Sequence, residues 1–271
     1  MPRSRRKSGP VVCSAVAILA LAIAGCGDDD EENSGSVGPS GSPNLPTQDR
    51  LAFVIDSVTG NPPSGNGGLS LNMWATVVDR SGIVRAVAFS GTKTGDQWPG
   101  SRVISAQKAN TANDFSLDGL ALSTANLYAP TQPGGSLFGL QESNPVNPDV
   151  AYGGNADDYG TAKDFMIGKR IGGVNVFGGG VALYDSDGNV IGAVGVSGDT
   201  SCADHNIAWK VRDALALDFV PAGVADGGAD DNIIYDIDAN GVSASGFGHP
   251  ECSPEATAIG QQLPVTNPIG G

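Results

Sequence analysis

The segment IGGVNVFGGGVALYDSDGNVIGAVGVSG (171–198), followed by DHNIAWKVRDALALD (204–218), constrains the fold more than any other part of the chain. Two apolar, β-branched runs flank the stretch 185–189, whose composition is typical of a β-hairpin turn. Apolar residues at helical spacing then predict a helix over 204–218. A hairpin followed by a helix predicts a sheet that is covered by helices.

The preceding residues predict further strands and one helix. We expect strands at 51–58, 71–79 and 82–90, of which the last two form a hairpin, and a helix at 101–116 that Ser101 caps. Small residues on one side of this helix suit close packing against a sheet. The polar, Gly- and Pro-rich segment 117–163 is interpreted as a long loop. This order favours the α+β class with an antiparallel sheet.

The N-terminus is typical of an exported lipoprotein. Basic residues precede an apolar run at 11–25, which is shorter than the roughly 20 residues that a membrane span needs. Residues 1–25 are therefore interpreted as a signal peptide. Its end, Ile23-Ala24-Gly25-Cys26, resembles the lipobox of bacterial lipoproteins, so Cys26 is the predicted lipidation site. A signal peptide with ordinary cleavage is the alternative.

Residues 26–48 are acidic and then rich in Ser, Gly and Pro, which predicts a disordered tether. The following residues, 49–271, form the predicted domain, with a loop-rich C-terminal extension from about 219. Gly27 after the lipidated cysteine favours the outer membrane or cell surface. We therefore expect a lipid-anchored protein of the cell envelope.

Charge excludes one class of partner. Residues 1–25 carry 4 of the 15 basic residues and none of the acidic ones, so the mature chain keeps 11 basic and 29 acidic residues, a net charge of −18. Nucleic acid is therefore an unsuitable partner, because its phosphates require Lys and Arg.

The cysteines of the predicted domain are Cys202 and Cys252. In an exported chain this pair predicts a disulfide. The disulfide would close a loop of about 50 residues, and the chain-entropy model gives such a loop a stabilisation of roughly 4 kcal/mol. Metal ligation by the cysteines is the alternative, although the chain has no CxxC pair to support it.

Several catalytic and binding motifs are incomplete. Gly192, Gly195 and Gly198 have neither the P-loop nor the dinucleotide spacing. Ser197 lacks the final glycine of a nucleophile elbow. The loop starting at Asp236 matches only the first half of an EF-hand, so calcium binding by the acidic residues of 226–240 stays open. An enzymatic role is the least favoured hypothesis.

Three separated pieces of the chain resemble the GlcG/HbpS-like family of haem-binding proteins. They are WATVVDRSGIVRAVAFSG (74–91), AQKANTA (106–112) and GGGVALYDSDGNVIGAVGVSGDTSCADHNIA (178–208). The resemblance implies a profilin-like α+β domain, often homo-oligomeric, with a pocket for a tetrapyrrole. The family's long helix before the first of these strands has no counterpart at 61–70, and the tail from 219 departs from the family pattern.

Within this resemblance, haem is the expected cofactor. His205 and His249 are the only histidines, and each lies three residues from one of the paired cysteines. Imidazole is a good iron ligand, so both are candidate ligands of haem iron or another metal. Trp209 and Arg212 share a helix face with His205. The alternative is that both histidines only make structural hydrogen bonds.

Two residues of the family's helix motif, Lys108 and Thr111, are candidate contacts for a ligand carboxylate, or structural residues. The first functional hypothesis is a lipid-anchored haem-binding protein that acts in haem capture, storage or sensing. The alternative is a non-catalytic envelope module for structure or interaction that keeps the fold without a ligand.

Overall fold

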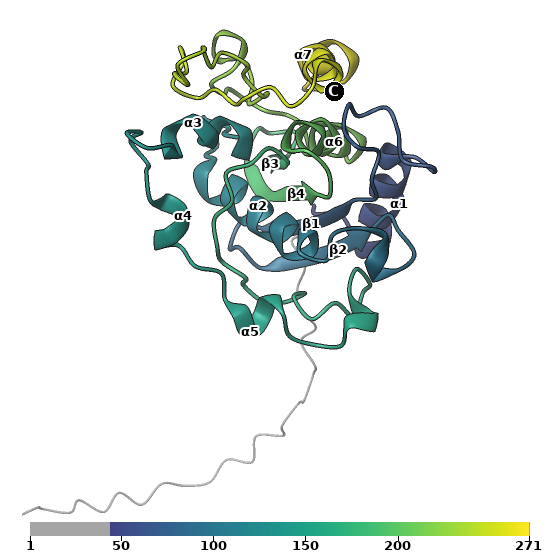
Figure 1. The fold of residues 1–271 in the computed structure, drawn as a ribbon. Helices are drawn as coiled ribbons and strands as arrows, with labels where there is room; N and C mark the ends of the chain where they lie inside the picture. The colour runs from purple at the N-terminus through teal and green to yellow at the C-terminus, as the bar shows by residue number, and fades with distance from the viewer. Residues whose placement is uncertain (1–43, 271) are drawn as a thin grey trace, which may run out of the picture. The chain divides into compact units, whose positions relative to one another are not determined.

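The computed structural model describes residues 44–270, which Figure 1 shows in colour. The predicted signal peptide, the lipidation site Cys26 and most of the predicted tether lie outside the described residues. Within 44–270, no helix has both the length and the apolar character that crossing a membrane requires.

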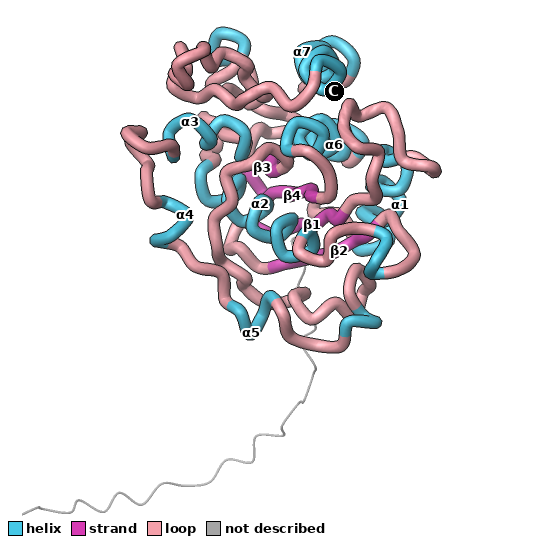
Figure 2. Tube along the Cα trace, in the orientation of Figure 1, coloured by secondary structure: helices cyan, strands magenta, loops and turns pink. Residues whose placement is uncertain are grey.

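A four-stranded sheet forms the centre of the described chain (Figure 2). Its strands are β1 (Trp74–Asp79), β2 (Val84–Phe89), β3 (Gly180–Tyr184) and β4 (Val190–Ser197), in the order β2-β1-β4-β3. All neighbours are antiparallel. The predicted α+β class and both predicted hairpins are therefore confirmed.

Helices cover both faces of this sheet. The helix α2 (Ser101–Phe115) packs on one face, and α1 (Gln48–Thr59) and α6 (Ser201–Ala214) pack on the other. Side chains of β1 alternate between the two layers, so Val78 lies on the α2 side and Val77 on the α1–α6 side. Burial on both faces explains why the strands are continuous apolar runs.

The predicted strand at 51–58 is wrong, because these residues form most of α1. The hydroxyl of Thr47 accepts a hydrogen bond from the Arg50 amide and caps the helix. Leu51, Val54 and Ile55 are buried and follow the i, i+3, i+4 spacing of a helix face. A helix therefore does precede the first strand, although residues 61–70 do not form it.

Glycines of the adjacent strands β3 and β4 let α2 approach the sheet closely. A Cβ on Gly195 would lie 2.0 Å from the Ser105 carbonyl oxygen and 2.4 Å from the Ala109 nitrogen. Gly180 pairs with Gly195 across the strands and also contacts the α2 backbone. The predicted small-residue face of this helix is thus confirmed, although Gly100, not Ser101, occupies the N-cap position.

The connection between α2 and β3 is mostly irregular, as predicted for 117–163. It contains only short helical turns of three or four residues, which are η2 (Thr124–Leu127), α3 (Tyr128–Thr131), α4 (Leu140–Ser143), α5 (Pro148–Ala151) and η3 (Ala156–Asp158). A further turn, η1 (Thr94–Asp96), lies in the loop after β2.

The C-terminal extension, 219–270, lies over α6 and is coloured yellow-green to yellow in Figure 1. It contains η4 (Asp226–Gly228) and α7 (Pro254–Thr266), a helix that we did not predict. Ser253 caps α7 by accepting from the Ala256 amide at 3.0 Å. The helix α6 starts at Ser201 rather than at 204, because Thr200 caps it.

Candidate functional site

Polar side chains of α6 face the extension rather than solvent. We call His205, Asn206, Trp209 and Arg212 the outer face of α6, because they lie on the side that the extension covers. All four are buried. The predicted grouping of His205, Trp209 and Arg212 is observed, but the group contacts protein on every side.

His205 is fully buried in the second turn of α6. Its Nε2 accepts a hydrogen bond from the Ile233 amide at 3.1 Å and lies 3.1 Å from Asn232 Oδ1. An accepting Nε2 leaves the imidazole proton on Nδ1, and this buried Nδ1 has no hydrogen-bond partner among residues 44–270. Burial lowers the pKa of His205 to about 4, so the ring is neutral at pH 7.

His249 comes from the extension and packs against the start of α6. Its Nδ1 donates to the Pro250 carbonyl at 2.7 Å, and its Nε2 lies 3.1 Å from Ser201 Oγ. Burial lowers its pKa to about 4 as well. Because Ser201 is one helical turn before His205, the two imidazoles lie in the same region of the protein.

Arg212 and Trp209 attach the extension to α6. The Arg212 guanidinium donates to both carboxylate oxygens of Asp231 at 2.9 and 2.8 Å, and both side chains are completely buried. The same guanidinium lies 4.6 Å from the centroid of the Trp209 ring, whose Nε1 donates to the Asn267 carbonyl at 2.8 Å. These contacts occupy much of the outer face with groups of the protein itself, while His205 Nδ1, Asn206 Oδ1 and Arg212 Nε have no hydrogen-bond partner among residues 44–270.

Lys108 and Thr111 are buried on the opposite side of the sheet from α1. Lys108 Nζ donates to Asp204 Oδ2 at 2.6 Å and to the Val196 carbonyl at 3.1 Å. The Thr111 hydroxyl donates to the Gln107 carbonyl at 2.7 Å. Thr111 also accepts from the Asn175 amide at 2.9 Å. Both side chains therefore connect segments of the core, and neither reaches a surface where a ligand carboxylate could meet it.

The cysteine pair joins α6 to the extension, with Cys202 and Cys252 as a disulfide whose Cα atoms are 6.0 Å apart. Cys202 is buried, whereas Cys252 is exposed. The pair lies beside His249, because Cys202 Sγ is 4.0 Å from His249 Nδ1. The structure thus brings both cysteines and one of the two histidines together.

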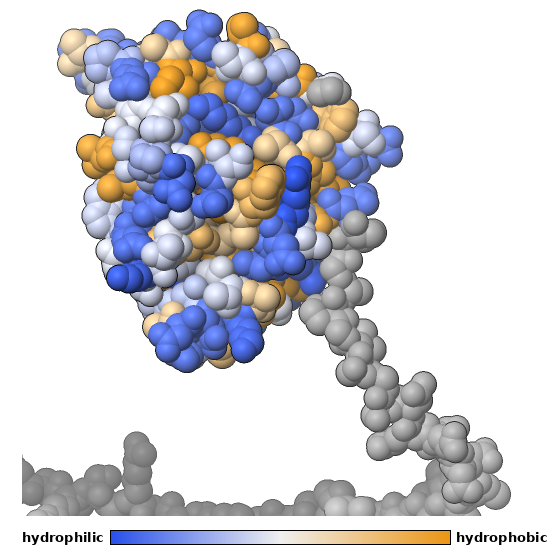
Figure 3. All heavy atoms as spheres, turned by 90° about the vertical axis from the view of Figure 1, so that its right-hand side faces the viewer, coloured by the Kyte–Doolittle hydropathy of each residue, from blue (hydrophilic) through white to orange (hydrophobic). Residues whose placement is uncertain are grey.

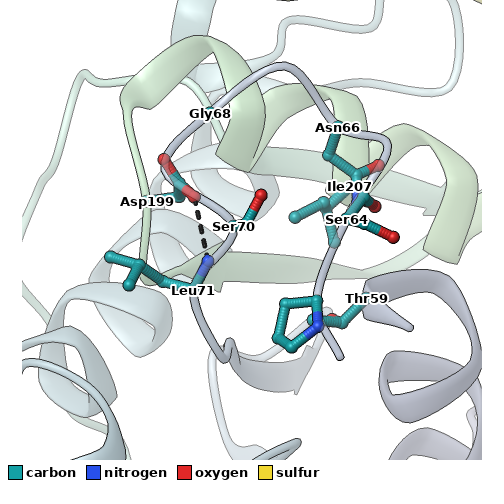
Figure 4. A pocket seen from close by; sticks show the side chains of 9 residues that line it. Thr59, Ser64, Asn66, Gly68, Ser70, Leu71, Asp199 and Ile207 are labelled. Atoms are coloured by element: carbon teal, nitrogen blue, oxygen red, sulfur yellow. Dashed lines mark hydrogen bonds between the residues drawn. The ribbon is translucent and has the colours of Figure 1, made fainter. Parts of the chain in front are cut away.

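A small cavity lies between the loop after α1 and the start of α6 (Figure 4). Its volume of about 10 Å³ is the space of a single water molecule. Asp199 fixes the loop by accepting from the Leu69 amide at 2.7 Å and from the Leu71 amide at 3.3 Å. This cavity therefore has a structural role and is too small for an organic ligand.

A larger cavity of about 440 Å³ opens beside the end of β2, and we call it the aromatic cavity. Trp74 and Phe89 stack in its wall at 4.3 Å between ring centroids, and Tyr159 adds a third ring. Lys93 and Asp157 supply charged groups. Its volume falls in the range of small-molecule sites, about 300–1,000 Å³.

The acidic loop holds its carboxylates in internal turns. Asp236 accepts from the Ser243 hydroxyl at 2.7 Å and from the Ser245 amide at 2.6 Å, and Asp238 accepts from the Val242 amide at 2.9 Å. The carboxylates of Asp236 and Asp238 are therefore held by hydrogen bonds to groups of their own loop.

The part of the chain that contains Gly180, Gly195 and the hairpin–helix segment matches a known family. The family model described as haem degrading protein HbpS-like matches residues 68–213, which is more than half of the chain. The chain belongs to the HbpS-like family. The predicted resemblance is therefore confirmed. Five of the six candidate ligand residues lie within the match, and His249 lies beyond it.

Two solved structures are similar to this HbpS-like chain. A Klebsiella pneumoniae protein, ORFY, matches 62% of this chain and 86% of its own, with 24% identity and a TM-score of 0.41. A PduOC:heme complex matches 61% of this chain and 89% of its own, with 22% identity and a TM-score of 0.41. No curated protein matches the chain.

The residues that sequence reasoning missed in this HbpS-like chain are those that the extension contributes. Asp231 and Asn232 meet Arg212 and His205 across the interface. A buried arginine in α6 predicts an acidic partner, but several aspartates of 226–238 satisfy that requirement equally. The aromatic cavity was also missed, because Phe89 and Tyr159 are far apart in the sequence.

Proposed function

We propose that this chain binds haem and acts in haem capture, storage or sensing at the cell envelope, where a lipid on Cys26 anchors it. The observation that carries the proposal is the HbpS-like match over residues 68–213. The description of that family names haem, which makes haem the first ligand to test. Haem, when bound, supplies the iron and the porphyrin ring.

The chain's histidines suit iron in their chemistry. Both His205 and His249 are neutral imidazoles, which is the form that ligates a metal. The buried Nδ1 of His205 has no protein partner within the described part of the chain. When the ring proton moves to Nε2, which then donates to Asn232 Oδ1, Nδ1 becomes free to bind iron. We propose His205 as the leading iron ligand and His249 as the second.

Binding at these histidines requires the segments of the extension around Asp231 and Asn267 to separate from the outer face, while the disulfide keeps His249 beside α6. The extension completely buries His205 and occupies the guanidinium of Arg212 with Asp231. Displacing it would release Arg212 as a cation for a haem propionate and expose the Trp209 ring for stacking. Lys108 and Thr111 contact the core rather than the extension, so this site does not use them.

Haemin titration of the full chain in detergent tests the proposal. We expect a saturable Soret shift that His205→Ala abolishes and His249→Ala weakens. Lys93→Ala is the matched control, because Lys93 lies at the aromatic cavity. A shift that Lys93→Ala abolishes and His205→Ala preserves would place haem at the aromatic cavity. Equal, non-saturable signals from wild type and His205→Ala would refute a specific site.

Anchoring is tested separately with Cys26→Ser. We expect this variant to lose the incorporation of a labelled fatty acid and to leave the membrane fraction. The control is Cys252→Ser, which removes a different cysteine and should keep the label. Labelling that survives Cys26→Ser would rule out the proposed anchor.

A second candidate function is an envelope interaction module that keeps the fold without a ligand. The observation that favours it is the covered outer face, where Ile233, Asp231 and Asn267 occupy the polar groups of α6. Under this proposal the wild-type chain gives no saturable haemin signal. A single partner protein would instead copurify with it in a fixed ratio.

A further inference from the structure

A group of three soft metal-ligand side chains lies at the junction of α6 and the extension. Among residues 44–270, Cys202, His249 and Cys252 place one ligand atom each within 4.8 Å of one another. We call these three residues the Cys–His cluster. The disulfide is the oxidised form of this cluster, and the two thiols are its reduced form.

We propose that the reduced Cys–His cluster binds Zn²⁺. Two thiolates and one imidazole are a ligand set that zinc favours, with Zn–S distances of about 2.3 Å and Zn–N distances of about 2.0 Å. Tetrahedral angles at those lengths place the sulfurs about 3.8 Å apart and each sulfur about 3.5 Å from the nitrogen. Cys202 Sγ already lies 4.0 Å from His249 Nδ1.

The structure lets one sulfur move while the other stays fixed. Cys202 is buried in the first turn of α6 and is held there by the helix. Cys252 is exposed and lies in the irregular segment before α7. Reduction therefore allows Cys252 Sγ to move away from Cys202 Sγ to the separation that zinc needs, without rearranging α6.

The surroundings of Cys252 favour its thiolate. The Cys202 amide, at the N-terminus of the 14-residue helix α6, lies 3.2 Å from Cys252 Sγ, and the Ser201 hydroxyl lies 3.7 Å from it. Amides at a helix N-terminus stabilise a thiolate, which is the form that binds a metal. Ser201 Oγ also lies 3.1 Å from His249 Nε2, so it connects two members of the cluster.

The conversion needs a reductant, for which we name a small dithiol. The dithiol gives two electrons and two protons to the disulfide, forms its own cyclic disulfide and leaves two cysteine thiols. Zinc then displaces the two thiol protons. The His249 proton moves from Nδ1 to Nε2, which donates to Ser201 Oγ, so that Nδ1 binds the metal beside the two thiolates. Three protein ligands leave the fourth tetrahedral position to a water molecule.

The test uses the full chain, with and without reduction by the dithiol, which is then removed without oxygen. Added Zn²⁺ is measured by equilibrium dialysis with elemental analysis, and Co²⁺ serves as a spectroscopic probe. We expect one Zn²⁺ per reduced chain, thiolate-to-cobalt absorption in the near ultraviolet, and no zinc on the oxidised chain.

Two histidine variants form a matched pair, because both remove a buried imidazole and keep the disulfide cysteines. His249→Gln should weaken zinc binding at least tenfold, whereas His205→Gln should leave it unchanged. Cys252→Ser should abolish the cobalt–thiolate absorption of two sulfurs. A reduced chain that binds no zinc overturns the proposal, whether or not circular dichroism shows it folded. Equal binding by the reduced wild type and His249→Gln overturns it too.

Discussion

Lys108 of α2 and Asp204 of α6 form an ion pair of 2.6 Å in the interior, where both side chains are almost completely buried. Asp204 also accepts from the Gly198 and Asp199 amides at 3.1 and 2.8 Å, so one carboxylate fixes the turn between β4 and α6. Asp204 thus has a structural role in this chain.

Removing one partner of that pair should be strongly destabilising. Asp204→Asn leaves the Lys108 ammonium buried without a counter-charge, and we expect a loss of about 3–5 kcal/mol in the free energy of unfolding. Urea denaturation measures the loss. Asp187→Asn, an exposed change of the same type in the hairpin turn, should shift stability by less than about 0.5 kcal/mol. Similar losses in the two variants would contradict a buried ion pair.

Titration of the buried His205 should lower the free energy of unfolding as the pH falls from 6.5 to 4. The folded pKa of His205, lowered to about 4, lies below its ordinary value of 6.5. The unfolded chain therefore takes up more protons in this interval, and acidification favours unfolding. We expect His205→Gln to have a flatter stability curve than wild type between pH 6.5 and pH 4.

The stability curve of the wild type must be compared with that of His205→Gln, because protonation of Asp204 changes stability in the opposite direction. Burial raises the pKa of Asp204 to about 6, so the folded chain binds its proton more tightly between pH 3.8 and pH 6. Both proteins share that contribution, and it cancels in the difference. Parallel curves for wild type and His205→Gln would show that the His205 pKa is not lowered.

The double variant Cys202→Ser/Cys252→Ser should lose roughly 4 kcal/mol under oxidising conditions, because the bond closes a loop of 50 residues. Hydrogen exchange should rise most in the extension around 249–252, which the bond attaches to α6. Exchange that rises uniformly over the sheet instead would mean that the extension does not open separately.

Gly195→Ala should disrupt the contact between β4 and α2. The added methyl would meet the Ser105 carbonyl at 2.0 Å, and overpacking of this kind is destabilising by about 1–3 kcal/mol. Gly95→Ala is the control, since a Cβ there has no neighbour within 4 Å among the described residues. Thermal unfolding followed by circular dichroism measures both, and equal melting temperatures would disprove the close approach.

Local patterns were sufficient for the sheet and for two of its helices. The hairpin around Asp185 has a turn that its own carboxylate closes, with Oδ1 accepting from the Asp187 and Asn189 amides at 3.0 and 2.9 Å. The run LAFVIDSV misled us because β-branched residues suggest a strand, while the spacing of its buried residues is helical. Packing against the sheet decided between the two.

The candidate site was less predictable, since its contacts join segments far apart in the chain. His205, Trp209 and Arg212 were correctly placed on one helix face by their spacing. Nothing local indicated that Asp231 and Asn267 would cover this face, because such pairings depend on the path of the extension. Polar residues on a helix suit solvent, a ligand or another segment equally well.

The surface of the described chain carries exposed hydrophobic residues. On the face drawn in Figure 3, hydrophobic residues are interspersed with hydrophilic ones. Phe53, on α1, has 67% of its surface exposed. The implied homo-oligomer stays a prediction, which sedimentation of the full chain would test.

The interface between α6 and the extension combines hydrogen bonds, one ion pair, a small apolar cluster and the disulfide. The extension therefore resembles an intramolecular inhibitor, held by its covalent connection at a high effective concentration. Any molecule that binds the outer face of α6 must compete with it. The affinity measured for such a molecule would then combine the free energy of releasing the extension with the free energy of binding the uncovered helix.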